Sequence, residues 1–381
     1  MRNIYIPTRS INCKLVNILI EQLQYATTSR YNFPQTEHDT ELQKRLLEAS
    51  LRTMHAMKAK SFQPYEIEFF ERLEQKPQTN ISQDLDGKML STLLTPLTPI
   101  HDGTPIVGID VSSIKIGETE TGILCAVRGA IVWNLNRHYR YLRIGPFPFH
   151  ITEENKRELF NHLDGGLFPE MNMRLTPLAE TIGRLCNLVE RWIQTSISYS
   201  ATGSIILWDG SLTAGAPGSA FNEVSHILKT ARRQSNSVLA FSKVTSIRFL
   251  GWRITDLVAG REAPCLFEVE DLPLSISKNM HSLGRIYVAN LATGGSAFRL
   301  DIDKALSKED MVRSVQRLLG NELMFQGYPE SLRLAHIYST FTANDVIGIQ
   351  SFLTHEYELR IVPHSNMRKA LFGPYGTGFE D

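Results

Sequence analysis

The sequence is poor in cysteine, has no excess of charge of either sign, and contains no long apolar run. Its four cysteines, Cys13, Cys125, Cys186 and Cys265, are widely separated and form no CxxC pair. This spacing argues against a zinc knuckle and against a disulfide framework, and it suits a reducing cytoplasm. No uninterrupted apolar run is long enough to span a membrane, and the first residues lack the apolar core of a signal peptide. We therefore expect a cytoplasmic protein with no membrane partner.

The absence of net charge limits the kind of nucleic-acid surface that the chain can present. Forty Lys and Arg residues balance forty Asp and Glu residues, which gives a formal net charge of zero at pH 7. No global basic field marks a nucleic-acid partner, so any such surface must be a local patch. The length of 381 residues and the hydrophobic content of 42% are those of a soluble globular protein with one large domain or two modest ones.

Hydrophobic periodicity divides the chain near residue 100. The first hundred residues are predicted to be mostly helical, and the segment 77–99, rich in Thr, Ser, Gln and Pro, reads as a connector. The helices expected there are 15–25, 41–60 and 64–74. From Thr104 the pattern changes to strands, and then to alternating helices and strands. The strands expected are 105–113, 122–133, 138–144, 204–209 and 238–243, and the helices between them are 177–194 and 221–234.

The order of these elements predicts an α/β fold. A meander followed by alternating helix and strand forms a mixed sheet with helices packed against it. A hairpin of 286–289 with 297–302 and three further helices, 308–318, 330–338 and 343–353, are expected after it. We predict a helical N-terminal region at 1–100, which makes dimer or partner contacts, and a second domain at 101–381 with its core at about 104–245.

The stretch Ser204–Leu212 is the most informative part of the sequence. Four apolar residues after Ser204 predict a strand buried on both faces, and the strand ends on Asp209. A carboxylate at that position costs free energy unless a cation meets it; the alternative is that Asp209 only caps an Asp-Gly turn. In the expected sheet this strand can run parallel to 105–113 and beside it. Asp110 and Asp209 would then be neighbours, with Cα atoms roughly 5 Å apart.

Two neighbouring carboxylates repel each other unless they share a proton or a cation. A shared proton would call for two similar loops around the acids, and the sequence shows no such duplication. A divalent metal is therefore the better interpretation, and oxygen-rich ligation with one His suits Mg²⁺ or Mn²⁺ better than Zn²⁺. Such sites polarise a phosphoryl oxygen and activate water, so a phosphodiester is the natural substrate.

Several other residues are candidates for the same site, each with a purely structural alternative. The third metal ligand is expected from the helix before Asp209, where Glu180 points away from the apolar stripe, although a surface Glu does the same. Its rivals are Glu190, Glu223 and Glu118. His336 and Tyr328 are either site residues or ordinary packed side chains. Lys243, at a strand end, is expected to meet the phosphate or to steady the carboxylates. The candidates for DNA binding are Lys243, Arg232, Arg233, Arg248 and Arg253.

The sequence resembles the NurA nucleases in short motifs that occur in the same order between about residues 104 and 353. The motifs are Gly-Ile-Asp-Val-Ser-Ser at Asp110, Leu-Trp-Asp-Gly-Ser-Leu at Asp209, Phe-Ser-Lys-Val-Thr-Ser at Lys243, and Gly-Tyr-Pro-Glu-Ser-Leu-Arg-Leu-Ala-His with Tyr328 and His336. The resemblance implies an RNase H-like core and a metal-dependent DNA nuclease of the 5′–3′ exonuclease and single-strand endonuclease type. Family roles would place Asp110, Asp209, His336 and a helix Glu on two Mn²⁺ or Mg²⁺ ions.

The resemblance also implies a ring-like homodimer. Such a dimer would dock on a HerA-type hexameric ATPase and act in DNA end resection and double-strand break repair. Two alternatives stay open: a catalytically weak subunit that chiefly binds DNA or the ATPase, and another RNase H-like enzyme such as an RNA-directed nuclease or a recombinase. Residues 1–100 match no part of the family.

Overall fold

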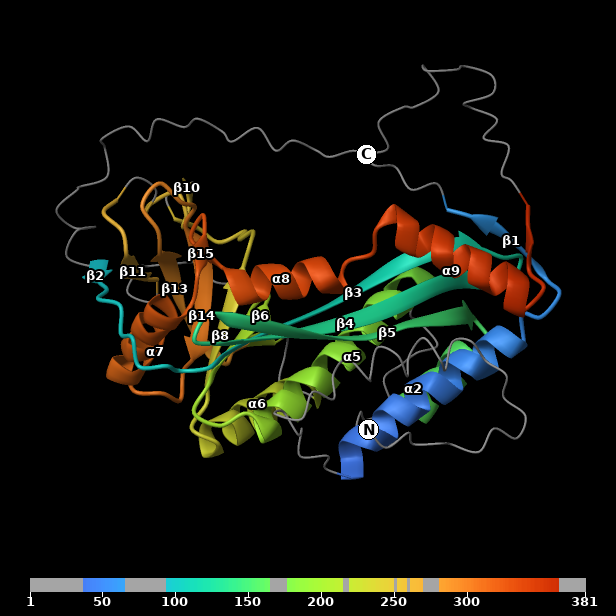
Figure 1. Ribbon diagram of the computed structural model, residues 1–381, viewed down its shortest axis with the longest axis horizontal. Helices are drawn as coiled ribbons and strands as arrows, with labels where there is room; N and C mark the ends of the chain where they lie inside the picture. Colours follow the sequence, from blue (N-terminus) through green and yellow to red (C-terminus); the bar gives the residue numbers. More distant parts are fainter. Residues whose placement is uncertain are drawn as a thin grey trace, which may run out of the picture.

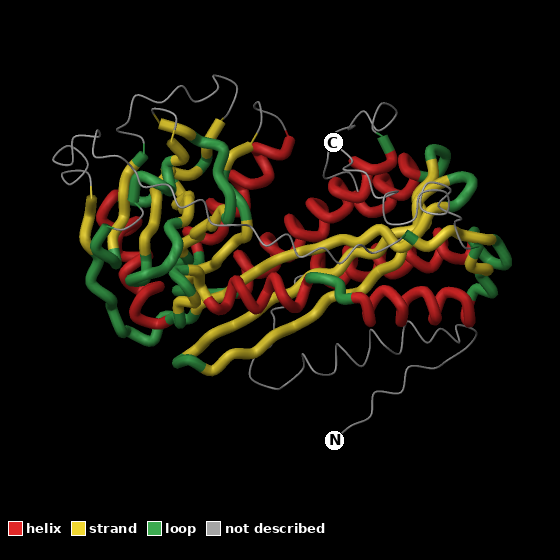
Figure 2. The backbone as a smooth tube through the Cα atoms, turned by 90° about the horizontal axis from the view of Figure 1, so that it is seen from above, coloured by secondary structure: helices red, strands yellow, loops and turns green. Residues whose placement is uncertain are grey.

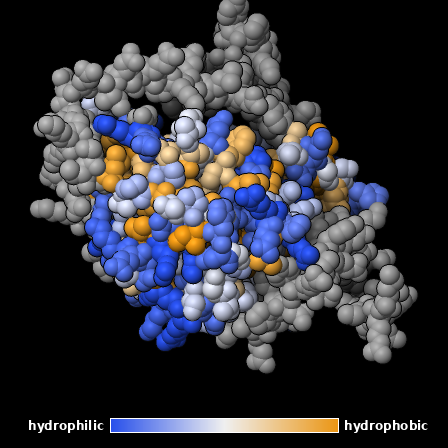
Figure 3. Space-filling model, turned by 60° about the vertical axis from the view of Figure 1, so that its left-hand side comes forward, coloured by the Kyte–Doolittle hydropathy of each residue, from blue (hydrophilic) through white to orange (hydrophobic). Residues whose placement is uncertain are grey.

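The structure, a computed structural model, describes residues 37–65, 94–164, 177–214, 219–249, 252–258, 261–269 and 281–362. These residues form an eleven-stranded mixed sheet with helices on both faces (Figure 1). Seen from above, the long strands run diagonally across the molecule, with short strands crowded at one end (Figure 2). On the face shown in Figure 3, hydrophobic residues lie among hydrophilic ones, which dominate its lower part.

Three long antiparallel strands form one side of the sheet. They are β3 (Ile106–Glu118), β4 (Gly122–Leu135) and β5 (His138–Thr152). The two residues between β4 and β5, Asn136 and Arg137, both have positive φ. A two-residue hairpin turn with this backbone matches the right-handed twist of its strands, and Asn tolerates it well.

Two parallel strands follow on the other side of β3. β6 (Ile205–Asp209) pairs with β3, and β8 (Ser237–Ser242) pairs with β6. The crossover helices are α5 (Leu178–Ser200) and α6 (Ser219–Arg233). The resulting order β5-β4-β3-β6-β8, with β4 antiparallel to the rest of the central strands, confirms the predicted RNase H-like mixed sheet.

Antiparallel strands extend the sheet beyond β8, and the predicted hairpin is confirmed as part of this extension. The added strands are β14 (Phe298–Asp303), β13 (Gly284–Asn290), β11 (Cys265–Glu268) and β2 (Leu94–Pro96). At the far end of β3, β1 (Ser61–Pro64) and then β17 (Arg360–Ile361) join the sheet. Three small ribbons pair β7 (Thr213–Ala214) with β12 (His281–Ser282), β9 (Arg248–Phe249) with β10 (Trp252–Arg253), and β15 (Met324–Phe325) with β16 (Tyr328–Pro329).

The helices form two layers, one on each face of the sheet. Side chains along each strand point alternately towards one layer and the other. Residues of α2 (Glu37–His55), α4 (Lys156–Asp164), α5 and α6 share one hydrophobic core with Ile109 and Trp208. Residues of α7 (Lys308–Asn321) and α8 (Glu330–Ser339) share a second core with Leu207 on the opposite face. α9 (Ala343–Glu356) packs against the end of α2 and β1. Because successive side chains on a strand point to opposite faces, Asp110 and Asp209 both point towards α8.

Helix α8 lies against the sheet at Gly108, two residues before Asp110 (Figure 1). A Cβ atom on Gly108 would come within 2.6 Å of the Ser331 carbonyl oxygen, which is backbone and cannot turn aside. The absence of a side chain at Gly108 is therefore what lets α8 approach the strand that carries Asp110.

The structure corrects the expected ends of several elements. We predicted a loop from Thr195 to Gly203, but α5 continues to Ser200 because Ile197 extends its buried stripe after Ile193 and no helix breaker precedes Gly203. The helix predicted at 64–74 is contradicted at its start, since Pro64 belongs to β1. Residues 66–74 lie outside the described residues, as does the predicted helix 15–25. β1 and β2 tie the first hundred residues into the sheet. Within the described ranges, every helix is too short or too polar to span a bilayer.

Candidate metal centre

The candidate site lies where β3 and β6 separate. The two strands pair as far as Ile109 and Trp208, the residues directly before Asp110 and Asp209. β6 ends at Asp209, while β3 continues beside β4 to Glu118. The predicted proximity of Asp110 and Asp209 is thus confirmed, although Asp110 lies within its strand and not at the strand end.

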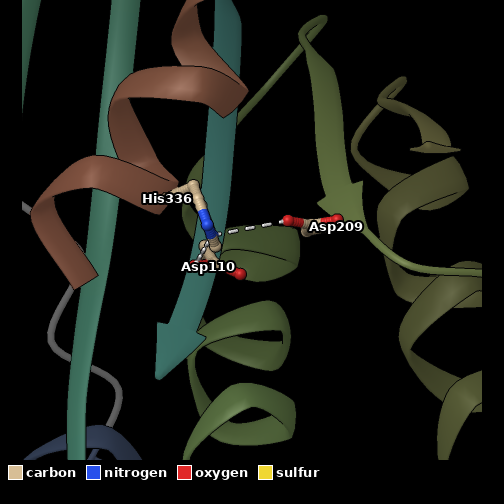
Figure 4. A group of neighbouring side chains, drawn as sticks. All are labelled: Asp110, Asp209 and His336. Carbon is tan, nitrogen blue, oxygen red and sulfur yellow. Dashed lines mark hydrogen bonds and ion pairs between the residues drawn. The ribbon is translucent and has the colours of Figure 1, made fainter. Parts of the chain in front are cut away.

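His336, on helix α8, completes a three-residue cluster with Asp110 and Asp209. It lies on α8 and points towards both acids (Figure 4). Its Nδ1 atom is 3.1 Å from Asp110 Oδ2 and 3.7 Å from Asp209 Oδ2. One potential ligand atom from each residue lies within 4.8 Å of the others. Asp110 and His336 are 226 residues apart in the chain, and the packing of α8 on β3 brings their side chains together.

Glu190 approaches the cluster from α5, on the other face of the sheet. Burial raises the pKa of Glu190 to about 7; Arg191 lowers it, and the carboxylates of Asp110 and Asp209 raise it. Its Oε1 atom accepts a hydrogen bond of 2.7 Å from Gln194 Nε2. The Asp110 and Asp209 carboxylates thus act on Glu190 through their charge, although Glu190 is not part of the three-residue cluster.

Glu180, our first choice for the third ligand, is placed elsewhere. It is exposed in the first turn of α5, ten residues before Glu190, which is about 15 Å along the helix axis. The structure therefore favours Glu190 over Glu180, and the third ligand stays a prediction. Of the other rivals, Glu118 pairs with Lys115, and Glu223 lies on α6 outside the cluster.

Two further candidates lie beside Asp209. Lys243 Nζ donates a hydrogen bond of 2.6 Å to Asp209 Oδ2 and lies 5.8 Å from the Tyr328 ring centroid. Burial raises the pKa of Tyr328, and the negative charges of Asp209 and Asp110 raise it further. The Tyr328 hydroxyl is buried beside Asp209. Lys243 and Tyr328 thus lie at the same site as the acids, beside Asp209.

The arginines predicted to bind DNA fall into two groups. Arg232 pairs with Asp303. Arg232 and Arg233 both lie at the end of α6, near the start of β8, whereas Lys243 follows the other end of β8. This placement does not support a shared DNA surface with the carboxylates. Arg248 and Arg253 are exposed and directly opposite each other on β9 and β10, a few residues after Lys243.

Sequence reasoning missed the polar residues that hold the acids in place. Ser339 Oγ donates a hydrogen bond to Asp110 Oδ2, and Ser112 Oγ lies 3.0 Å from Ser339 Oγ. Gln194 holds Glu190 from the following turn of α5. Ser and Gln residues are common on helices and strands, so the sequence carries no signal that separates these from the rest.

The residues present fit a hard divalent cation. Asp110, Asp209 and His336 offer two carboxylates and one imidazole, an oxygen-rich donor set of the kind that Mg²⁺ and Mn²⁺ prefer, and no described cysteine belongs to it. Lys243 contacts Asp209 directly, and a bound divalent ion would offset the remaining repulsion between the two acids.

Several solved structures are similar to this chain. Among solved structures, the NurA nuclease from Sulfolobus solfataricus is 17% identical over 70% of this chain and 89% of that chain, with a TM-score of 0.47. A structure of NurA with manganese is 11% identical over 71% and 93% of the two chains, with a TM-score of 0.35. Endonuclease V from Bacillus subtilis is 12% identical over 71% and 91%, with a TM-score of 0.31. No curated protein matches the sequence.

The family model of the NurA domain matches residues 104–339. This range is more than half of the chain, and it contains Asp110, Asp209, Lys243, Tyr328 and His336. The chain therefore belongs to the NurA domain family.

Proposed function

We propose that the protein is a metal-dependent DNA nuclease that hydrolyses phosphodiester bonds. Asp110, Asp209, His336 and Glu190 would hold Mn²⁺ or Mg²⁺, in a centre of two ions. The observation that carries the proposal is the convergence of Asp110, Asp209 and His336 within 4.8 Å in a chain of the NurA domain family.

A divalent ion held by these residues would polarise the phosphoryl group and make water a better nucleophile. The remaining residues support this chemistry through charge. Lys243 presents an ammonium group beside Asp209, where it can contact a phosphate oxygen. Tyr328 keeps its proton because its pKa is raised, so it acts as a hydrogen-bond donor towards substrate and not as a base.

We include the substrate, partners and cellular role in the proposal on the basis of family membership. The protein would act as a 5′–3′ exonuclease and single-strand endonuclease, as a cytoplasmic homodimer with a HerA-type hexameric ATPase, in DNA end resection and double-strand break repair. Residues 1–100 would supply dimer or partner contacts. Lys243, Arg248 and Arg253 are the cations that we expect to contact DNA on the side of the metal centre.

The substitution Asp209→Asn tests this function. It keeps the volume of the side chain but removes a charged ligand, and loss of several kcal/mol of transition-state stabilisation lowers the rate by at least about 100-fold. The measurement is the Mn²⁺- or Mg²⁺-dependent degradation of end-labelled single-stranded and duplex DNA, with the thermal unfolding midpoint as a check of folding. A variant that cuts as fast as the parent would refute the assignment of the site. A parent protein that cuts no DNA with either metal would refute the nuclease function.

A further inference from the structure

We propose that Ser339 is a positioning residue that holds the Asp110 carboxylate in place for the metal, and that Ser112 supports it by donating a hydrogen bond to the Ser339 hydroxyl. This inference rests on the proposed metal-dependent function and deepens it. Ser339 is the last residue of α8 and is fully buried. Its hydroxyl donates to Asp110 Oδ2, the same oxygen that lies 3.1 Å from His336 Nδ1.

The hydrogen-bond acceptors around Ser339 decide where its single proton goes. The His336 carbonyl oxygen is 3.0 Å from Ser339 Oγ, but it already accepts hydrogen bonds from the Thr340 backbone N–H at 3.0 Å and the Thr340 hydroxyl at 2.7 Å. A carbonyl oxygen has two lone pairs, and both are taken. The Ser339 proton is therefore directed to Asp110.

The same argument assigns a role to Ser112. Its Oγ is 3.0 Å from Ser339 Oγ, and one of the two hydroxyls must donate in this contact. Because the Ser339 hydroxyl donates its single proton to Asp110, Ser112 is the donor in its contact with Ser339. The result is a directed chain from Ser112 through Ser339 to Asp110, in which each hydrogen bond strengthens the next.

Ser339 matters most when His336 serves as a metal ligand. A nitrogen that gives its lone pair to a metal carries no proton, so Nδ1 cannot ligate the ion and also donate to Asp110. The hydrogen bond from Ser339 does not compete with the metal in this way. It restrains the terminal torsion of Asp110, which is otherwise broad. Hydrogen bonds of this kind behind a metal ligand set its orientation.

Helix α8 offers a matched control for this inference. Ser331 is also fully buried, and its hydroxyl also donates to a buried carboxylate, that of Glu322. Glu322 lies outside the metal centre and binds Asn134 and Tyr139. Removing the Ser331 hydroxyl leaves an equivalent gap in the same helix without touching Asp110.

The experiment measures Mn²⁺ affinity of the full-length, metal-free protein by electron paramagnetic resonance of the free ion, without DNA. We expect Ser339→Ala to weaken Mn²⁺ binding about tenfold, Ser112→Ala to weaken it less, and Ser331→Ala to leave it unchanged. In cleavage assays, the Mn²⁺ concentration for half-maximal rate should rise in the same order, and high Mn²⁺ should restore the maximal rate of Ser339→Ala. Thermal unfolding without metal reports the purely structural cost of each substitution.

The outcomes separate this inference from the proposed function. If the parent binds Mn²⁺ and Ser339→Ala binds it equally well, or if Ser331→Ala loses as much affinity, the role of Ser339 is refuted while the nuclease function stands. If the parent binds no Mn²⁺, the proposed function falls and the inference falls with it. Should Ser339→Ala fail to fold, Ser112→Ala decides, and unchanged Mn²⁺ affinity in that variant refutes the directed chain.

Discussion

The sequence does not distinguish Glu190 from Glu180 as the helix residue nearest to the acids. Both lie on the helix that precedes β6, but Glu190 is near the acids and Glu180 is exposed in the first turn. Helical spacing indicates which side chains leave the apolar stripe. It does not indicate which turn of the helix crosses the end of the neighbouring strand, because that depends on the packing of α5 against β3. The sequence could therefore predict Asp110, Asp209 and His336 from their motifs, but not the choice of Glu.

We predict that Glu190→Gln lowers metal-dependent DNA cleavage by about 10- to 100-fold. The substitution preserves side-chain size and keeps an oxygen for Gln194, but it removes the negative charge that a cation would meet. Initial cleavage rates at a fixed Mn²⁺ concentration measure the effect. Glu180→Gln is the control and should behave as the parent, because Glu180 is exposed; equal losses in the two variants would contradict the new choice of ligand.

At the scale of elements, α8 connects the fold to the metal centre. It carries His336 and Ser339, and it rests on Gly108 of the strand that carries Asp110. The strand order could be predicted because buried runs and short links leave few ways to build the sheet. The docking of α8 could not, since nothing in its sequence identifies the glycine that it contacts more than two hundred positions earlier.

We predict that Gly108→Ala destabilises the protein by about 1–3 kcal/mol and weakens Mn²⁺ binding. The new Cβ would meet the backbone of Ser331 at 2.6 Å, so α8 must shift and take His336 and Ser339 away from Asp110. Chemical denaturation and Mn²⁺ titration measure the two effects. Gly348→Ala on α9, where a Cβ meets nothing within 4 Å, should keep or raise stability and leave Mn²⁺ binding unchanged. Unaltered Mn²⁺ affinity in Gly108→Ala would show that the site does not depend on this contact.

At the scale of the whole molecule, Asp345 joins the start of α9 to the central sheet through ion pairs with Arg128 and Arg143. Arg128 on β4 is buried and donates a hydrogen bond of 2.8 Å to Asp345 Oδ1. Partial burial raises the pKa of Asp345, but hydrogen bonds from Arg128 and the Thr342 backbone outweigh it, so the pKa lies well below its usual value. A carboxyl group with a lowered folded-state pKa stabilises the protein above its unfolded pKa of about 3.9, and this contribution is lost as the pH falls further.

We predict that Asp345→Asn destabilises the protein at pH 7 by about 3 kcal/mol, because it leaves the buried Arg128 without its carboxylate. The difference between parent and variant should shrink as the pH is lowered from about 5 through 4 towards the folded-state pKa of Asp345. Urea unfolding at a series of pH values measures it. Glu158→Gln breaks the exposed pair with Arg52 and should have little effect at any pH. A gap between parent and Asp345→Asn that stays constant with pH would contradict the role given to this carboxylate.

The wide separation of the site residues along the chain has a consequence for biosynthesis. Asp110 and Asp209 leave the ribosome long before His336 and Ser339, which come 226 and 229 residues after Asp110. Until α8 has emerged and packed on β3, the two acids lack their imidazole and their hydroxyl donor. A growing or prematurely terminated polypeptide that lacks α8 would thus carry both acids without a competent centre.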